Sequence, residues 1–170
     1  MANIGLFYGS TTGKTADAAE RIQAALGGDS VVDLFDIADK EVTDLAEYDC
    51  LIIGCPTWNI GDVQDDWDAL IDDLDQVDFT GKTVAYFGTG DQIGYADNFQ
   101  DAMGILEEKV TSLGGKTVGH WSAEGYEHSE SQALRDGKFC GLALDEDNEP
   151  DKTDERIKTW CGQIKAAMGG

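Results

Sequence analysis

A short stretch near the start of the chain combines hydroxyl groups, glycines and a lysine. Residues 9–15 read GSTTGKT; an apolar run precedes them and a helical pattern follows. The first N–H groups of a helix have no partner within the helix, and together with serine and threonine hydroxyls they form a good anion site. The stretch therefore predicts a bound phosphate group.

Two other interpretations of this stretch have to be weighed. The loop that binds ATP or GTP has the pattern G-x-x-x-x-G-K-[ST], and Gly13, Lys14 and Thr15 match its second half. Gly9 precedes Gly13 by four residues instead of the required five, so the loop is too short to surround a triphosphate. The simpler alternative is that the serine and threonine side chains only cap the helix, which is common.

Two aromatic residues lie among small residues in later loops. Trp58 lies within residues 56–61, after the third expected strand, and Tyr95 lies within residues 88–95, after the fourth. The other tryptophans occupy core-type positions of an expected helix or strand. A single aromatic residue in a loop is more often a packing lid, but two of them beside a phosphate site suggest a flat ring held between them.

The elements that position these loops follow from hydrophobic patterning. Short apolar runs alternate with stretches of helical period, which is typical of a parallel sheet covered by helices on both faces. We expect strands at residues 4–8, 31–35, 51–54, 84–87 and 118–121, with a continuation at 139–144. Apolar side chains at helical spacing predict helices within residues 18–26, 63–74, 99–113 and 157–168. The predicted fold class is α/β, with a doubly wound five-stranded parallel sheet, in which ligands bind beyond the carboxyl ends of the strands.

A mostly polar segment with glycines interrupts this alternation. It covers residues 122–138 and precedes the apolar run 139–144. Long loops inside compact domains are uncommon and usually have a function. We expect an insertion that splits the fifth strand.

Length and charge limit the classes of function. The 170 residues predict one domain, residues 1–170, and the 34 acidic and 12 basic residues give a formal net charge of −22. This charge repels nucleic acid and anionic lipid and favours basic partners or cations. The sequence has neither an apolar run long enough for a membrane helix nor a signal-peptide pattern, so we expect a cytoplasmic protein without membrane insertion.

The cysteines and histidines carry little chemistry by their spacing. The cysteines are Cys50, Cys55, Cys140 and Cys161. We expect them to be buried small apolar residues, because their spacing is not that of a disulfide framework. Cys50 and Cys55 begin a plant-type iron–sulfur pattern, but Trp58 occupies the position of its next cysteine. His120 and His128 are too few for a metal site, and we interpret them as ordinary polar residues.

Taken together, these segments resemble the flavodoxins, specifically the long-chain flavodoxins of cyanobacterial type, over essentially the whole chain. The matching segments are residues 4–9, 10–15, 56–61, 85–101 and 141–148. Residues 122–138 resemble the insertion that distinguishes the long-chain branch. The resemblance implies the flavodoxin-like strand order 2-1-3-4-5, with FMN at the point where the strand order reverses.

The resemblance also implies the cofactor and the residues that hold it. We expect an FMN-containing one-electron carrier rather than an enzyme, with Trp58 and Tyr95 on the two faces of the flavin ring. The residues that resemble the phosphate cradle are Ser10, Thr11, Thr12, Gly13, Lys14 and Thr15. Other positions match residues at the flavin edge, the ribityl chain or the phosphate, or close to them: Pro56, Thr57, Asn59, Ile60, Gly61, Thr89, Gly90, Asp91, Asn98, Phe99, Gln100 and Asp147.

The partners implied by the resemblance are basic redox proteins. They are photosystem I, ferredoxin–NADP reductase and nitrogenase reductase, which the carrier would serve in place of ferredoxin under iron limitation, and we expect a monomer. Residues 62–78 contain eight aspartates and no lysine or arginine. Such a run is usually a solvated helix face, but beside the flavin it would steer the carrier onto basic surfaces.

Two other functions are compatible with this fold class. An FMN-dependent quinone reductase would need an open pocket above the ring, which Trp58 and Tyr95 would obstruct. A phosphoacceptor receiver domain needs acidic residues after the first strand and an aspartate at the end of the third. The chain has Gly9 and Ser10 at the first position and Cys55 at the second, so we set the receiver aside.

Overall fold

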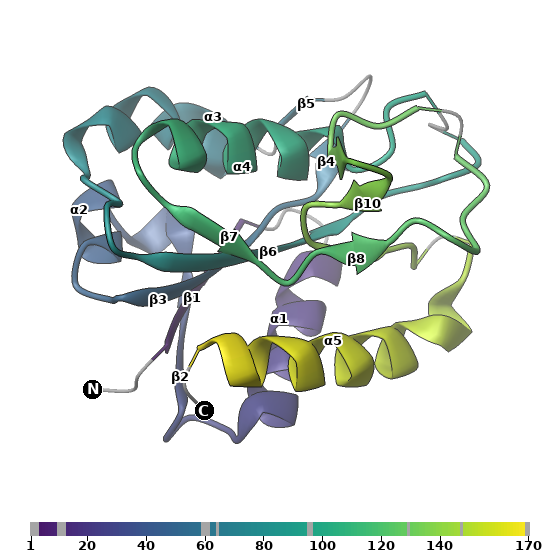
Figure 1. Ribbon diagram of the computed structural model, residues 1–170, viewed down its shortest axis with the longest axis horizontal. Helices are drawn as coiled ribbons and strands as arrows, with labels where there is room; N and C mark the ends of the chain where they lie inside the picture. Colours follow the sequence, from purple (N-terminus) through teal and green to yellow (C-terminus); the bar gives the residue numbers. More distant parts are fainter. Residues whose placement is uncertain are drawn as a thin grey trace.

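A parallel sheet forms the centre of the protein. The computed structural model describes residues 4–9, 13–58, 62–63, 65–94, 97–128, 130–146 and 148–168. The strands, in spatial order, are β11 (Leu142–Leu144), β6 (Thr83–Thr89), β3 (Cys50–Gly54), β1 (Ile4–Tyr8) and β2 (Val32–Asp36). They pair in parallel, and their order is the predicted 2-1-3-4-5 (Figure 1). The flavodoxin-like fold class is confirmed.

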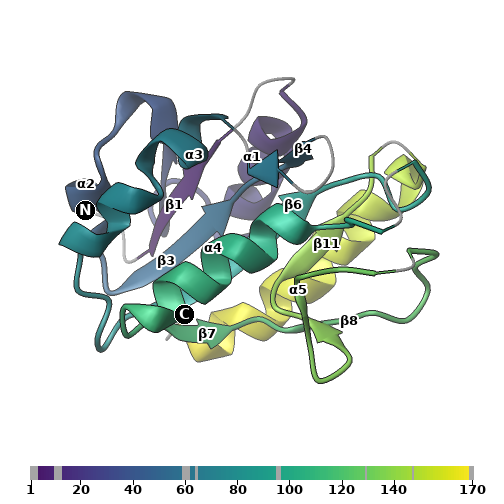
Figure 2. The same cartoon turned by 90° about the horizontal axis from the view of Figure 1, so that it is seen from above.

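Helices cover both faces of this sheet, as Figures 1 and 2 show. Successive side chains of a strand point to opposite faces, so each strand supplies both halves of the core. Leu6 of β1 packs in the half formed with α1 (Lys14–Leu26) and α5 (Thr153–Ala167). Phe7 packs in the other half, with α2 (Val42–Leu45), α3 (Asp65–Leu70) and α4 (Asp101–Ser112). Burial on both faces explains why the central strands read as continuous apolar runs.

The fifth strand position is filled by two separate pieces. β7 (Lys116–Val118) pairs with the first residues of β6, and β11 pairs with the last. Between them lies a small antiparallel sheet of β8 (Trp121–Ser122), β10 (Lys138–Phe139) and β9 (Leu134–Arg135). The predicted insertion and the split of the fifth strand are confirmed, and Figure 2 shows the small sheet beside α4 and α5.

Two predicted elements are wrong in detail. The strand expected at residues 118–121 ends at Val118, because Gly119 has a φ of +80° and turns the chain away from the sheet. The helix expected at residues 63–74 is divided into α3 and the 3₁₀ helix η2 (Asp72–Gln76). Both pieces are rich in aspartate, a poor helix former, so the apolar spacing does not sustain one continuous α-helix.

The remaining short elements connect the larger ones. These are η1 (Ile37–Asp39), η3 (Pro150–Lys152) and the antiparallel pair of β4 (Thr57–Trp58) and β5 (Asp62–Val63). The cysteines are free thiols; Cys55, Cys140 and Cys161 are buried as predicted, and Cys50 is half-buried. Among the residues described, no group of histidine, cysteine and acidic side chains is arranged to hold a metal ion. In the same part of the chain, no helix is long and apolar enough to cross a membrane.

Candidate cofactor site

Three loops leave the sheet at the same edge, from the adjacent strands β1, β3 and β6. Backbone hydrogen bonds extend the sheet one residue beyond each of these strands: Gly9 N–H donates to Gly54 O at 3.0 Å, Cys55 N–H to Phe87 O at 3.1 Å, and Gly90 N–H to Leu144 O at 3.0 Å. The carboxyl ends of parallel strands meet at one edge, which is where ligands bind in this fold class. The three predicted loops therefore begin side by side.

The first loop ends at the start of α1. Gly13 caps this helix in the left-handed region, with a φ of +90°, a conformation that favours glycine. A Cβ on Gly13 would have no atom within 4 Å, so the space beside it is open. Lys14 begins the helix with an exposed side chain, and Thr15 is buried. Ser10, Thr11 and Thr12 lie outside the described residues.

Thr15 joins the first loop to the third. Its hydroxyl lies 3.0 Å from the hydroxyl of Thr89 at the end of β6, and both side chains are buried. These two threonines are 74 positions apart in the sequence. Two residues from separate predicted segments are thus in direct contact.

The third loop begins with a turn around Asp91. Its Oδ1 accepts hydrogen bonds from Ile93 N–H at 3.0 Å, Gly94 N–H at 2.7 Å and the Asn148 amide at 2.7 Å. Burial acts to raise the pKa of Asp91, but these hydrogen bonds and the charge of Lys14 outweigh it and lower the pKa. The Asp91 carboxylate therefore stays ionised and holds the turn, while the side chain of Ile93 is exposed.

The end of this loop is anchored at the start of α4. Gln100 caps α4 with a left-handed φ of +61° and is completely buried. Its amide donates to Leu144 O at 3.0 Å, so this carbonyl accepts hydrogen bonds from both Gly90 and Gln100. Thr57 in the second loop accepts a hydrogen bond from Ala102 N–H at 3.0 Å. Side chains of the second and third loops thus hold the same helix end.

Phe99 and Asn98 occupy different surroundings although they are neighbours. Phe99 is buried, and its ring lies 5.6 Å from Tyr126, 5.5 Å from His128 and 5.6 Å from Phe139. This aromatic cluster belongs to the core beneath the insertion. Asn98 is half-buried and donates to Asp101 at 3.0 Å.

Several predicted site residues have no described position. Apart from the hydroxyl residues of the first loop, Asn59, Ile60, Gly61, Tyr95 and Asp147 lie outside the described residues. The structure describes Trp58 as part of β4, opposite Asp62. The prediction of two rings on the faces of a flavin therefore remains a prediction.

The geometry also reveals residues that sequence reasoning missed. Gln92 is buried in the third loop, although the next residue, the apolar Ile93, is exposed. Asp145 is completely buried directly after β11 and accepts a hydrogen bond from Gln92 N–H at 3.2 Å. Both residues lie in segments that carry the family resemblance, but no spacing pattern marked them as important.

Comparisons with known proteins give one consistent result. A family model described as flavodoxin matches residues 6–160. A flavodoxin from Picosynechococcus is 64% identical over 169 residues, covering 99% of each chain, and one from Synechocystis is 62% identical over 168 residues with the same coverage. Among solved structures, Fusobacterium nucleatum flavodoxin bound to flavin mononucleotide has a TM-score of 0.92 and 34% identity, covering 98% of this chain and 99% of that one.

Proposed function

This chain belongs to the flavodoxin family, and on that premise we propose which of its residues bind the cofactor and which proteins exchange electrons with it. The protein is an electron carrier with FMN as its cofactor, rather than an enzyme. A quinone reductase on the same fold is not favoured, since the curated relatives of this chain are flavodoxins. We regard residues 1–170 as one FMN-binding domain.

The first loop suits the phosphate group of FMN. The N-terminus of α1 presents backbone N–H groups, the space beside Gly13 is open, and Thr15 adds a hydroxyl. Lys14 is the basic residue in this loop, so most of the attraction comes from N–H and O–H groups. We propose that residues 10–15 hold the phosphate.

The second and third loops suit the flavin ring and the ribityl chain. Their described residues lie at the ends of β3 and β6. The hydrogen bond between Thr15 and Thr89 connects the end of β6 to the proposed phosphate loop. This contact is the observation that carries the proposal, because it joins the predicted phosphate loop to the predicted ring loop. We propose Thr57, Thr89, Gly90 and Asp91 among the residues bordering the cofactor, with Trp58 and Tyr95 on its two faces.

The role of the protein is to bind and tune the cofactor. When bound, FMN supplies the one-electron chemistry, and the protein sets its orientation and electrostatic surroundings. A net charge of −22 disfavours additional negative charge in the site. We propose that this charge makes the reduced protein a strong electron donor.

The same charge supports basic redox partners. We propose photosystem I, ferredoxin–NADP reductase and nitrogenase reductase, for which the carrier would replace ferredoxin when iron is scarce in a photosynthetic cell. The relatives named above from Picosynechococcus and Synechocystis support this choice. A cytoplasmic monomer remains our expectation.

Binding measurements with two ligands test the phosphate side. The protein without cofactor is titrated with FMN and with riboflavin, which lacks the phosphate, and FMN should bind more tightly. Thr15→Val keeps the shape of the side chain but removes the hydroxyl, so it should weaken FMN about tenfold and riboflavin much less. Equal losses for both ligands would contradict the phosphate assignment.

Salt dependence tests the partner assignment. Electron transfer to a basic reductase should slow as salt rises, because screening weakens attraction beyond about 8 Å at physiological ionic strength. Charge reversal of Asp65, Asp66 and Asp68 should slow transfer about tenfold at low salt. Asp29→Lys is the control for a single charge reversal, to be compared with the reversal of Asp66 alone, since Asp29 is exposed before β2, at the amino end of the strands. If neither salt nor these substitutions change the rate of electron transfer, the acidic segment is only a solvated surface and does not steer partners.

A further inference from the structure

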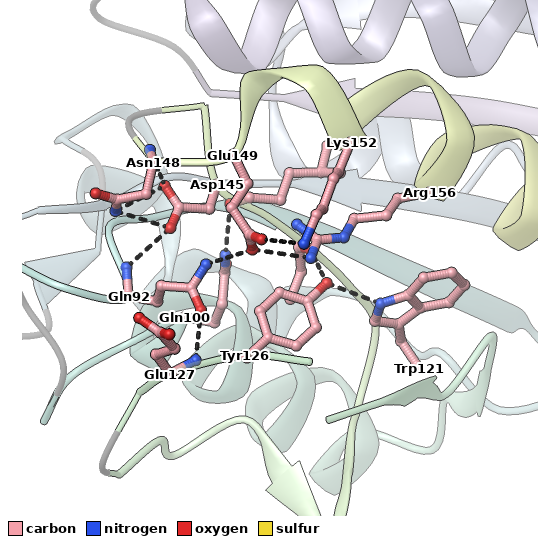
Figure 3. A network of polar contacts seen from close by, with 12 residues as sticks. Gln92, Gln100, Trp121, Tyr126, Glu127, Asp145, Asn148, Glu149, Lys152 and Arg156 are labelled. Carbon is pink, nitrogen blue, oxygen red and sulfur yellow. Dashed lines mark hydrogen bonds and ion pairs between the residues drawn. The ribbon is translucent and has the colours of Figure 1, made fainter. Parts of the chain in front are cut away.

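Gln92 is a buried side chain whose hydrogen bonds connect three parts of the molecule. It is 2% exposed. Its amide nitrogen donates to Glu149 Oε1 at 2.6 Å, and its amide oxygen accepts from Glu127 N–H at 2.5 Å. Its own N–H donates to Asp145 at 3.2 Å. Figure 3 shows Gln92 between the insertion, the end of β11 and the start of α5.

The residues that hold Gln92 are themselves held in place. Glu149 Oε1 also accepts from Arg156 Nη2 at 2.9 Å, and Lys152 lies 2.5 Å from Glu149 Oε2. The Arg156 guanidinium lies over the Tyr126 ring, 4.3 Å from its centre. Hydrogen-bonded side chains with several partners have little freedom to move. Glu149, which precedes η3 and α5, is therefore held by Arg156 of α5 and, through the Tyr126 ring that contacts this guanidinium, by the insertion.

Tyr126 connects this group to the sheet. Its hydroxyl donates to Ala143 O at 2.6 Å and accepts from the Trp121 indole N–H at 2.9 Å. Burial raises the pKa of Tyr126 to about 12, so the hydroxyl keeps its proton and its donor role at neutral pH. The insertion therefore contacts β11 through the same aromatic ring that supports Arg156 (Figure 3).

The third loop depends on these side-chain contacts. Side-chain hydrogen bonds hold residues 91–94 in place: those of the Asp91 turn, of Asn148 and of Gln92. Glutamine suits this position because its amide offers both a donor and an acceptor, whereas leucine has neither and an ionised glutamate has acceptors only.

We propose that Gln92 is a positioning residue for the flavin ring, acting with Glu149 as a clamp on residues 89–94. The proposal rests on the proposed function, in which this loop borders the ring. A clamped loop is ordered before the ligand binds, so binding costs less conformational entropy and the ring meets a defined surface. The clamp therefore contributes to the affinity for the ring and to the reduction potential. The Gln92 amide itself is bonded to Glu149 and Glu127, so it acts through the loop.

The first experiment removes the clamp and compares two ligands. Gln92→Leu retains much of the volume but loses both amide contacts, and Gln163→Leu is the control, because Gln163 is exposed on α5. FMN and riboflavin should both bind about tenfold more weakly to Gln92→Leu, by a similar factor, because the phosphate side is untouched. At least one midpoint potential of the bound flavin should shift, whereas Gln163→Leu should change neither quantity.

A second pair of variants keeps the test valid if Gln92→Leu does not fold. Gln92→Glu places two carboxylates together and should weaken both ligands. Adding Glu149→Gln exchanges the amide and the carboxylate, which restores the donor–acceptor pair while Glu127 N–H keeps an acceptor. The double variant should recover a measurable part of the affinity and the potential lost in the single variant, because the contact at residue 92 is restored while the carboxylate that pairs with Lys152 and Arg156 is lost.

Three results would overturn the clamp. They are unchanged affinities and potentials in a folded Gln92→Leu, a loss confined to FMN with riboflavin unaffected, or no recovery in the exchanged double variant. The proposed function is tested separately by the unmodified protein. If that protein fails to bind FMN, the function is wrong; if it binds and the Gln92 variants bind equally well, only the clamp is wrong.

Discussion

The phosphate side and the ring side of the proposed site are held in different ways. The phosphate side is one continuous segment, in which β1, residues 9–15 and α1 follow one another. The ring side depends on Gln92, whose partners Glu127, Asp145 and Glu149 lie 35, 53 and 57 positions later. Local backbone geometry builds the first, and packing of distant segments builds the second. Substitutions in segments that are distant from Gln92 along the chain should therefore disturb the ring side and leave the phosphate side unchanged.

The largest expected effect comes from separating the insertion from α4. A Cβ at Gly104 would lie 2.4 Å from Gln132 O, so Gly104→Ala must displace backbone and should lower the free energy of unfolding by about 2 kcal/mol. It should also weaken FMN and riboflavin by similar factors, because the insertion supports Gln92. Urea unfolding and ligand titration measure these two effects.

Gly162→Ala is the matched control for that prediction. Gly162 is also inside a helix, but a Cβ there would meet no atom within 4 Å. The substitution should stabilise the protein by about 0.5–1 kcal/mol, the usual gain for alanine over glycine in a helix. A similar increase in the free energy of unfolding for Gly104→Ala would show that the insertion can move to accommodate the methyl group. The phosphate side and the ring side would then differ less than we infer.

A smaller effect is expected where the two sides meet. Thr89→Val removes the partner of the buried Thr15 hydroxyl and should lower the free energy of unfolding by about 1 kcal/mol. A double-mutant cycle with Thr15→Val should give a coupling energy of about 1 kcal/mol. Additive effects in the unfolding measurements would indicate that the two sides are independent.

Acid should weaken the ring-side clamp, because protonation of Glu149 removes the charge that Lys152 and Arg156 contact. Burial acts to raise the pKa of Glu149, but Lys152, Arg156 and Gln92 lower it from 4.5 to about 2. A lowered pKa means that the carboxylate stabilises the native state above about pH 4.5 and that this contribution is lost as the pH falls toward 2. Glu149→Gln should be less stable than the parent at pH 7 and show a shallower loss of thermal stability across this range. Parallel pH profiles would contradict this role.

The smallest expected effect concerns His128 in the aromatic cluster. Burial lowers its pKa, and Nδ1 is buried without a hydrogen-bond partner among the described residues. The unfolded chain therefore takes up the proton first, so native stability falls as the pH drops through about 6.5. His128→Phe keeps a ring against Phe99 and Phe139 and should remove a few tenths of a kcal/mol of this pH dependence. Thermal unfolding between pH 7.5 and 5.5 would detect the change, and an unaltered slope would assign the dependence to other groups.

Much of the scaffold could be predicted from hydrophobic patterning. The strand expected at residues 4–8 coincides with β1, and the two long helices at the ends of the chain lie where their apolar spacing placed them. The split fifth strand was predicted because a polar segment interrupts an apolar run. The helix at residues 63–74 was predicted too long, since apolar spacing there continues through an acidic sequence that forms α3 and then η2.

The candidate site divides in the same way. Thr15 and Thr89 were named from separate segments and lie in contact; Phe99 packs against Tyr126 and His128 of the insertion, and its place at the cofactor stays a prediction. Gln92 was not named at all. A polar residue in a loop has the same sequence pattern whether water or a buried carboxylate surrounds it.

The sequence by itself determined the order of strands and helices, the loop chemistry of the phosphate side and the negative charge of the whole chain. These properties depend on the spacing of nearby residues or on composition, so they need no knowledge of distant contacts. Only the tertiary structure decided what holds the ring side. Pairing of β11 with β6 brings Gln92 to Glu149, the insertion supplies Glu127, and no local rule encodes a hydrogen bond between residues 57 positions apart.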